Sequence, residues 1–252
     1  MTRGPHQAFF FLVALLFFPV ASDADEPQEF FQAFAAATAN FEQGKTREAA
    51  AGLQTLGQKL QTSPWREIAL LKAAELAESF DRPTATKNYQ EVVARMKDRA
   101  TEPLSRALFA LAGRGLQRLE TIEIEVALKK YYLAKVEYPA SLETLVQAKL
   151  LAADTIRDVA GKLYSYATGA EKLLPSIPRQ TYTLEKIDAP PFGWKDAKIV
   201  GMSAGSAVLQ WPNAPSRTVR AGEKVDDLEV FSVLDNGVVL GNDARLVVLS
   251  YK

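Results

Sequence analysis

The chain of 252 residues contains no cysteine, and its only histidine is His6. A protein without cysteine has no disulfide framework, so its stability must come from packed cores. Beyond residue 6 there is neither a thiol nor an imidazole, which excludes zinc sites built on these ligands and Ser-His or Cys-His catalysis. Excess charge is also lacking, because 30 basic residues balance 30 acidic residues. We therefore expect no metal, no cofactor and no nucleic-acid partner.

Long apolar runs are absent except near the start of the sequence. Arg3 precedes the uncharged stretch 9–20, and small residues follow as far as Ala24. A basic end, an apolar centre and a small-residue cleavage site are the three regions of a secretory signal peptide. The run has about 12 residues, fewer than the roughly 20 that span a bilayer. We predict a cleaved signal peptide over residues 1–24, and an uncleaved membrane anchor is the alternative.

Export of a chain without disulfides fits the periplasm of a double-membraned bacterium. Cleavage after Ser22 or after Ala24 would leave an acidic mature start. We expect the mature chain to contact the membrane only if the signal stays uncleaved.

Helical periodicity dominates residues 25–119. Apolar residues recur at helical spacing, alanine is frequent, and each break contains a glycine or a proline near a cap residue. The pattern predicts antiparallel pairs of helices over residues 27–42, 46–61, 65–80, 83–98 and 102–118.

Small and aromatic residues in these helices follow a recurring pattern. The residues of the first pair are Ala37, Gly44, Ala49, Leu53, Leu56 and Pro64, and those of the second are Trp65, Ala73, Phe80, Ala85 and Tyr89. About 75 residues thus resemble tetratricopeptide repeats, which implies a helical-repeat domain over residues 25–119 that binds proteins. Repeats bury surface only against neighbours, so we expect the next segment to cover the free flank of the array.

A helix and a short motif characterise residues 120–189. The predicted helix 122–135 is followed by Tyr138-Pro139, by Ser141-Leu-x-x-Leu145 and by Asp158-x-x-Gly161-x-x-Tyr164-x-Tyr166. This segment resembles the globular domain of type II secretion pseudopilins of the protein G kind, which implies a small helix-plus-sheet domain. The calcium loop and the processing site of that family have no counterpart, so we expect neither a bound metal nor assembly into a pilus. The tyrosines of this segment should pack the helix against the sheet; they are Tyr131, Tyr132, Tyr138, Tyr164, Tyr166 and Tyr182.

Short β-rich runs separated by turn residues make up the C-terminal part. Residues 190–195, which begin with Pro190-Pro191-Phe192-Gly193, indicate a linker. Beyond it, six short strands within residues 196–252 predict a small sandwich or barrel. The strands are expected over 198–201, 206–211, 217–220, 228–234, 237–240 and 244–251.

The order of these strands is also familiar. Gly201, Ala207 to Leu209, Val219 to Glu223 and Asp235 to Leu240 resemble the homology region of type II secretion protein C and type IV pilus protein P. The resemblance implies docking on the periplasmic end of a secretin. Recognition would use an exposed strand edge, where main-chain pairing supplies affinity. We expect the partner to bind at Val208, Leu209 and Gln210.

Three motifs suggest catalysis or metal binding but have simpler structural interpretations. Gly201-x-Ser203-x-Gly205 matches a nucleophile elbow, yet a strand follows it and no histidine is available as the base, so we predict a hairpin. Glu123 and Glu125 are two residues apart on a helix and point to different sides. The acidic residues Glu223, Asp226 and Asp227 match no calcium loop and indicate a polar hairpin tip.

The sequence as a whole predicts a multidomain α+β protein with helical hairpin repeats, then a small helix-plus-sheet domain, then a small all-β domain. We expect an exported, periplasmic, non-catalytic adaptor or scaffold of a type II secretion or type IV pilus related apparatus. An envelope enzyme such as a carboxylate-dependent glycosidase and a purely structural helical-repeat protein remain the alternatives.

Overall fold

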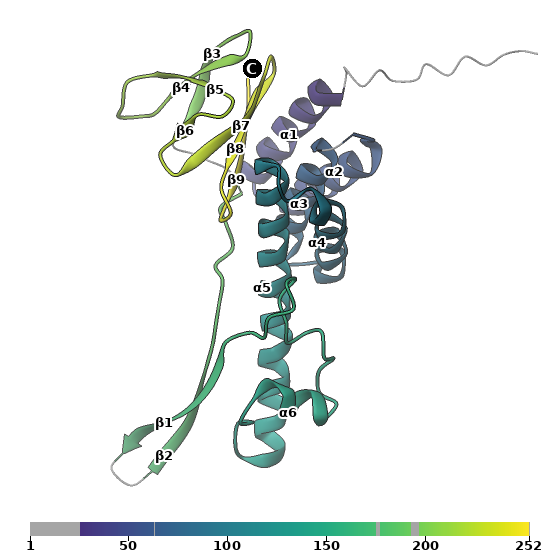
Figure 1. Ribbon diagram of the computed structural model, residues 1–252, viewed down its shortest axis with the longest axis vertical. Helices are drawn as coiled ribbons and strands as arrows, with labels where there is room; N and C mark the ends of the chain where they lie inside the picture. The colour runs from purple at the N-terminus through teal and green to yellow at the C-terminus, as the bar shows by residue number, and fades with distance from the viewer. Residues whose placement is uncertain (1–25, 63, 175–176, 193–196, 252) are drawn as a thin grey trace, which may run out of the picture.

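The computed structural model describes residues 26–62, 64–174, 177–192 and 197–251. The predicted signal peptide, residues 1–24, lies outside this part of the chain. Helices come first and small antiparallel sheets follow, so the fold is α+β, as expected (Figure 1). None of the described helices is both long enough and apolar enough to cross a membrane.

Five helices and one helical turn form the N-terminal part. The expected helices over residues 27–98 are confirmed to within a few residues, and Asp81 caps α4 by accepting a hydrogen bond from Thr84 N at 3.2 Å. Each helix packs on the next, and α3 also contacts both α1 and α5. We call α1 to α4 with residues 103–119 of α5 the helical core. The elements are α1 Glu26–Glu42, α2 Thr46–Lys59, α3 Trp65–Ala77, α4 Arg82–Met96, the 3-10 turn η1 Lys97–Arg99 and α5 Pro103–Lys135.

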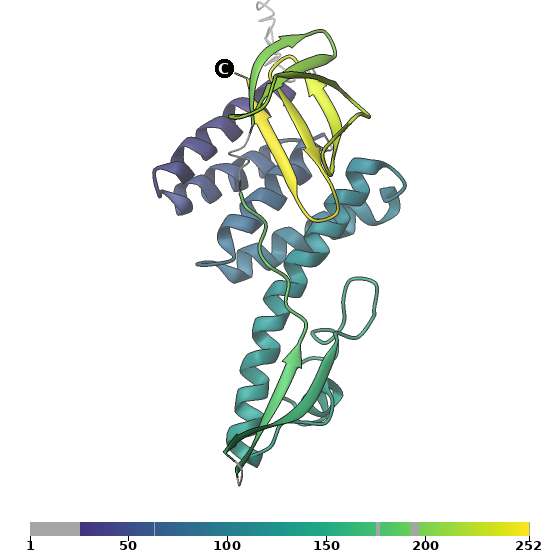
Figure 2. The ribbon, with the colours of Figure 1, turned by 90° about the vertical axis from the view of Figure 1, so that its left-hand side faces the viewer.

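Helix α5 differs from the prediction of two helices, 102–118 and 122–135. It is a single helix of 33 residues, about 50 Å long at 1.5 Å per residue, and the expected domain boundary at 119/120 falls inside it. The reason is local, because neither glycine nor proline occurs between Leu116 and Lys135. Its first half packs in the helical core, and its second half extends well beyond it (Figures 1 and 2).

The second half of α5 carries a small module, which we call the projecting module, residues 120–187. Here α6, Leu142–Gln147, and the hairpin of β1, Tyr166–Leu174, and β2, Ile177–Leu184, pack along α5. The core of the module contains Ile124, Leu128 and Leu145. The predicted packing of the tyrosines is confirmed for Tyr131, Tyr138, Tyr164, Tyr166 and Tyr182, and the ring of Tyr132 lies 4.7 Å from that of Tyr138.

A tight turn at Asp158 leads into the hairpin of the projecting module. The Asp158 carboxylate accepts hydrogen bonds from the backbone of Ala160 at 2.9 Å and of Lys162 at 2.8 Å. Gly161 adopts φ +81°, a conformation that favours glycine. The turn lies against α5, where a Cβ on Gly113 would come within 2.9 Å of the Val159 side chain.

The C-terminal strands form two packed sheets, which we call the C-terminal sandwich, residues 197–250. All six predicted strands are present, together with the short strand β6. Their orders are β3-β4-β5 and β6-β7-β8-β9, and both sheets contribute to one apolar cluster. The strands are β3 Lys198–Ser203, β4 Ser206–Gln210, β5 Arg217–Arg220, β6 Lys224–Val225, β7 Leu228–Leu234, β8 Gly237–Gly241 and β9 Leu246–Ser250.

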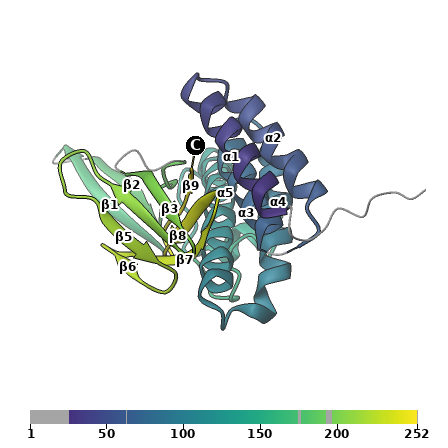
Figure 3. The same cartoon turned by 90° about the horizontal axis from the view of Figure 1, so that it is seen from above.

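The C-terminal sandwich packs on the helical core along α1 and α5 (Figure 3). The side chains of Val239, Leu246 and Val248 join the core of the helices, while their strand neighbours face the interior of the sandwich. Ser250 Oγ donates a hydrogen bond to Phe31 O at 3.1 Å. The expectation that the middle segment alone covers the helical array is incomplete, because its Val159 lies against Gly113 of α5 whereas β9 of the sandwich covers α1 and also contacts α5.

The predicted linker also contributes to this interface. Phe192 is buried, and its ring lies 5.7 Å from that of Phe34 and 4.9 Å from that of Phe41. Residues 193–195 of the predicted linker lie outside the described residues. The described part anchors the chain on α1 instead of leaving it free.

Candidate protein-docking site

The residues predicted to bind a partner lie on β4, which is the central strand of its sheet. It pairs with β3 on one side and with β5 on the other. Leu209 is fully buried inside the sandwich, whereas Val208 and Gln210 are partly exposed. The expectation of an exposed edge at Val208, Leu209 and Gln210 is therefore wrong, because both edges of β4 are already paired.

The edges of the two sheets are formed by other strands. β3 and β5 are the edges of one sheet, and β6 and β9 are the edges of the other; within the described residues neither β3 nor β9 has a second strand beside it. The two edge strands contact each other across the open side of the sandwich, next to α1. Edge strands expose unpaired main-chain N–H and C=O groups, which are templates for a further strand.

A groove of about 590 Å³ lies where these two edges meet α1. One wall is formed by Ala197 and by Lys198 and Ile199 of β3. The opposite wall is formed by Val248 to Ser250 of β9. Phe34, Phe41 and Phe192 supply aromatic surface from the helical side.

Polar groups also line the groove. The side chains of Glu42 and Lys198 are both exposed there. A groove with an apolar lining, strand edges along it and one charge of each sign suits an extended peptide segment.

Part of the β3 edge is protected against pairing. The register between β3 and β4 shifts between Ile199 and Gly201, so Val200 bulges out of the ladder and is 43% exposed. Bulges bend an edge strand and interrupt its pairing. The stretch of β3 that lines the groove, Lys198 and Ile199, precedes this bulge and keeps a regular geometry.

The serine motif and the acidic loop have structural roles. Gly205 adopts φ +72° in the β3–β4 hairpin, and Ser203 Oγ lies 2.6 Å from Ser206 Oγ, which confirms the predicted hairpin. In the acidic loop, Asp227 Oδ1 accepts a hydrogen bond from Arg245 Nη2 at 2.9 Å. Glu223 accepts a hydrogen bond from the Arg220 backbone at 3.3 Å.

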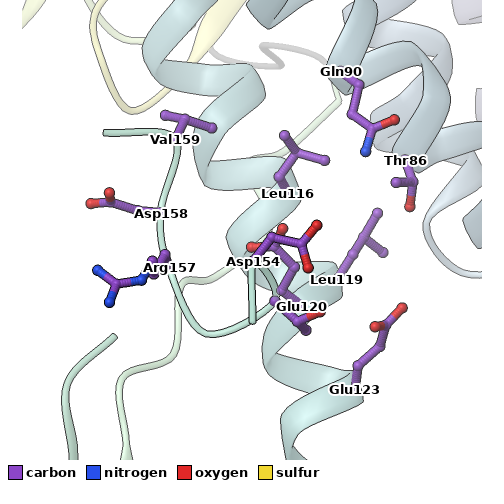
Figure 4. A pocket seen from close by; sticks show the side chains of 11 residues that line it. Thr86, Gln90, Leu116, Leu119, Glu120, Glu123, Asp154, Arg157, Asp158 and Val159 are labelled. Atoms are coloured by element: carbon purple, nitrogen blue, oxygen red, sulfur yellow. The ribbon is translucent and has the colours of Figure 1, made fainter. Parts of the chain in front are cut away.

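A second hollow, of about 330 Å³, lies where the helical core meets the projecting module (Figure 4). Glu120 and Glu123 of α5 line it together with Asp154, and Thr86 and Gln90 line it from α4. In Figure 4, Arg157 and Asp158 point away from the space between the loop and α4.

Glu120 is the carboxyl group with a perturbed environment in this hollow. Its partial burial raises its pKa, and the nearby acids Glu123, Asp154 and Asp158 raise it further, while the hydrogen bond from the Tyr164 hydroxyl opposes them. Burial beside Glu120 in turn raises the pKa of the Tyr164 hydroxyl. A glycosidase needs a second carboxyl group facing the first across the substrate. Asp158 is instead engaged by its own turn, and Glu123 follows Glu120 on the same helix face. Asp154, on the loop before this turn, is the further carboxyl group that lines the hollow, where the helical core meets the projecting module.

Comparison with family models, curated proteins and solved structures found no match. Within the part of the chain that the structure describes, no group of three or more acidic, histidine or cysteine side chains is arranged to hold a metal ion.

The groove was not predicted from the sequence, although a signal for it exists. The runs Gly237-Val-Val-Leu240 and Leu246-Val-Val-Leu249 lack the apolar and polar alternation of a half-buried strand. Continuous apolar strands are covered on both faces. This pattern indicates that β8 and β9 are covered on both faces. The interior of the sandwich covers one face, and the helical core covers the other.

Proposed function

We propose that this chain is an exported, non-catalytic adaptor that binds an extended segment of a partner protein in the groove between β3, β9 and α1. The observation that carries the proposal is the meeting of two edge strands with an aromatic surface in one groove. Main-chain pairing to a strand edge would supply affinity, and the aromatic surface of the groove would select apolar side chains of the partner.

The arrangement of the parts supports an adaptor in a secretion or pilus related apparatus. Antiparallel helix packing in the helical core is compatible with tetratricopeptide-like repeats. A helix beside a small hairpin in the projecting module is compatible with a pseudopilin-like domain. In this proposal the partner is the periplasmic domain of a secretin. Helix α5 holds the projecting module at a fixed distance from the helical core.

Titration of the protein with purified periplasmic domains of the secretins from the same genome tests this function. Ala39→Arg, on the groove side of α1, should weaken binding at least tenfold, because the long side chain fills the groove. Ala36→Arg is the matched control, since Ala36 is exposed on the same helix outside the groove and should bind normally.

A third variant separates the groove from the surface predicted from the sequence. Val208→Lys changes the outward face of β4 and should leave binding unchanged, because Val208 lies outside the groove. Loss of binding in Val208→Lys but not in Ala39→Arg would place the partner on the outer face. Failure of the unmodified protein to bind any of these secretins would contradict the secretin as partner.

A further inference from the structure

An apolar stripe runs along the exposed side of α5 in the projecting module. Val126 is 50% exposed, Leu133 is 73% exposed and Val136, at the end of the helix, is 76% exposed. Ile122 lies one turn before Val126 and is partly buried. Large apolar side chains with this exposure are few among the described residues, and two of them lie on this half-helix, with Val136 at its C-cap. Such a concentration marks an interaction surface.

The spacing of the stripe is that of a coiled-coil seam. Ile122, Val126, Lys129, Leu133 and Val136 follow one another at intervals of four, three, four and three residues. These intervals place the first four on one face of α5, as the a and d positions of a heptad pattern do, while Val136 adopts φ +59° at the C-cap, where the helix ends. The opposite face packs into the projecting module through Ile124, Ala127, Leu128 and Tyr131. Figure 2 shows α6 and the hairpin on one side of this half of α5, with none of the described elements along the other side.

We propose that two copies of this chain associate through this seam, with the two α5 helices antiparallel. Charge supports a second copy as the occupant, because Glu123 and Lys130 flank the seam on the same side, seven residues apart. In an antiparallel pair, Ile122 meets Leu133 of the second copy, and Glu123 approaches Lys130 of the second copy. Because the pair has two-fold symmetry, this attraction between opposite charges occurs twice.

Lys129 of the seam favours the antiparallel over the parallel orientation of the two helices. In a parallel pair, equivalent seam positions face each other, so Lys129 would meet Lys129 of the second copy between the helices. In the antiparallel pair, Lys129 packs beside Val126 of the second copy, and its ammonium group reaches water. The antiparallel pair also separates the two bulky helical cores, which lie at one end of each elongated molecule (Figure 2).

Sedimentation of the chain lacking residues 1–24 tests the association. The seam spans about 20 Å of helix, so a weak, concentration-dependent dimer is expected, with a doubled mass at about 100 µM protein and above. Leu133→Glu should abolish the dimer, because it places a charge in the seam. Val200→Glu is the control, since Val200 is also exposed but lies on β3, and this variant should still dimerise. Circular dichroism confirms that both variants are folded.

Charge variants test the orientation. Glu123→Lys and Lys130→Glu should each weaken the dimer about tenfold, because two attractions become repulsions. An equimolar mixture of these two variants should restore association, since opposite charges then face each other across the pair. A monomeric mass at every concentration, or a dimer that survives Leu133→Glu, would overturn the association. Lack of restoration in the mixture would overturn the antiparallel arrangement.

Discussion

Glu120 shows how one side chain fixes the loop of the projecting module on α5. It is the first residue of that module, next to the helical core, and its carboxylate accepts a hydrogen bond from the hydroxyl of Tyr164. Burial and the neighbouring acids raise its pKa above the ordinary value of 4.5. The folded protein therefore holds this proton to higher pH than the unfolded chain does.

Glu120→Gln should change how stability depends on pH. The stability contributed by a group with a raised pKa is fully present below the unfolded value, near 4.5, and is lost as the pH rises through the folded value. The glutamine keeps an acceptor for Tyr164 but does not ionise. We therefore expect the variant to gain stability relative to the unmodified protein between pH 4 and pH 8, measured by urea unfolding at intervals of about one unit. The exposed substitution Glu48→Gln is the control, and an equal pH trend in all three proteins would contradict the assignment.

At the scale of elements, the contact between α4 and α5 depends on a glycine. The ring of Tyr89 is fully buried against Gly115, where a Cβ would lie 2.3 Å from the ring. The Tyr89 hydroxyl donates to Glu78, and Arg118 Nη2 also binds Glu78, at 2.6 Å. Where α4 and α5 approach closely, the aromatic contact of Tyr89 therefore lies next to the ion pair of Arg118 and Glu78.

Gly115→Ala should cost about 1 to 3 kcal/mol of unfolding free energy, because the ring must leave its position in a packed core. Gly52→Ala is a matched control on α2, where nothing lies within 4 Å of the added carbon. Its helix should gain up to about 1 kcal/mol, since alanine favours helix more than glycine does. Urea unfolding measures both values, and equal stability of the two variants would show that α4 and α5 adjust freely.

At the scale of the whole molecule, the helical core and the C-terminal sandwich share one hydrophobic cluster. Phe31 of α1 approaches β8 so closely that a Cβ on Gly237 would lie 2.4 Å from the ring. Val239 and Val248 lie in the same cluster as the helical residues. Parts that share a core are expected to unfold together.

Gly237→Ala should destabilise the helices and the sandwich together, by about 1 to 3 kcal/mol, because the methyl group separates Phe31 from β8. The helices are followed by circular dichroism, and the sandwich by hydrogen exchange of the β8 amides. Gly201→Ala is the control, since its Cβ would make ordinary contact with Val208 at 3.6 Å. A change confined to one of the two probes would show that the parts are independent.

Local patterns accounted for most of the elements. The helices of residues 27–98 and the six strands were predictable because periodicity, caps and turn residues act within a few positions. The division of α5 at residue 119 was wrong, because no breaking residue occurs there. The choice of β4 as an exposed edge was wrong because strand order depends on pairing partners and not on the strand itself.

The sequence by itself determined the α+β composition, the lack of disulfides and the apolar runs of β8 and β9, since these follow from residue types and their spacing. Only the tertiary structure decided which strands are edges, that Phe192 is buried on α1 and that a groove lies between β3, β9 and α1. The physical reason is distance along the chain. Ser250 binds the backbone of Phe31 across 219 residues, and no local pattern specifies such a contact before the chain has packed.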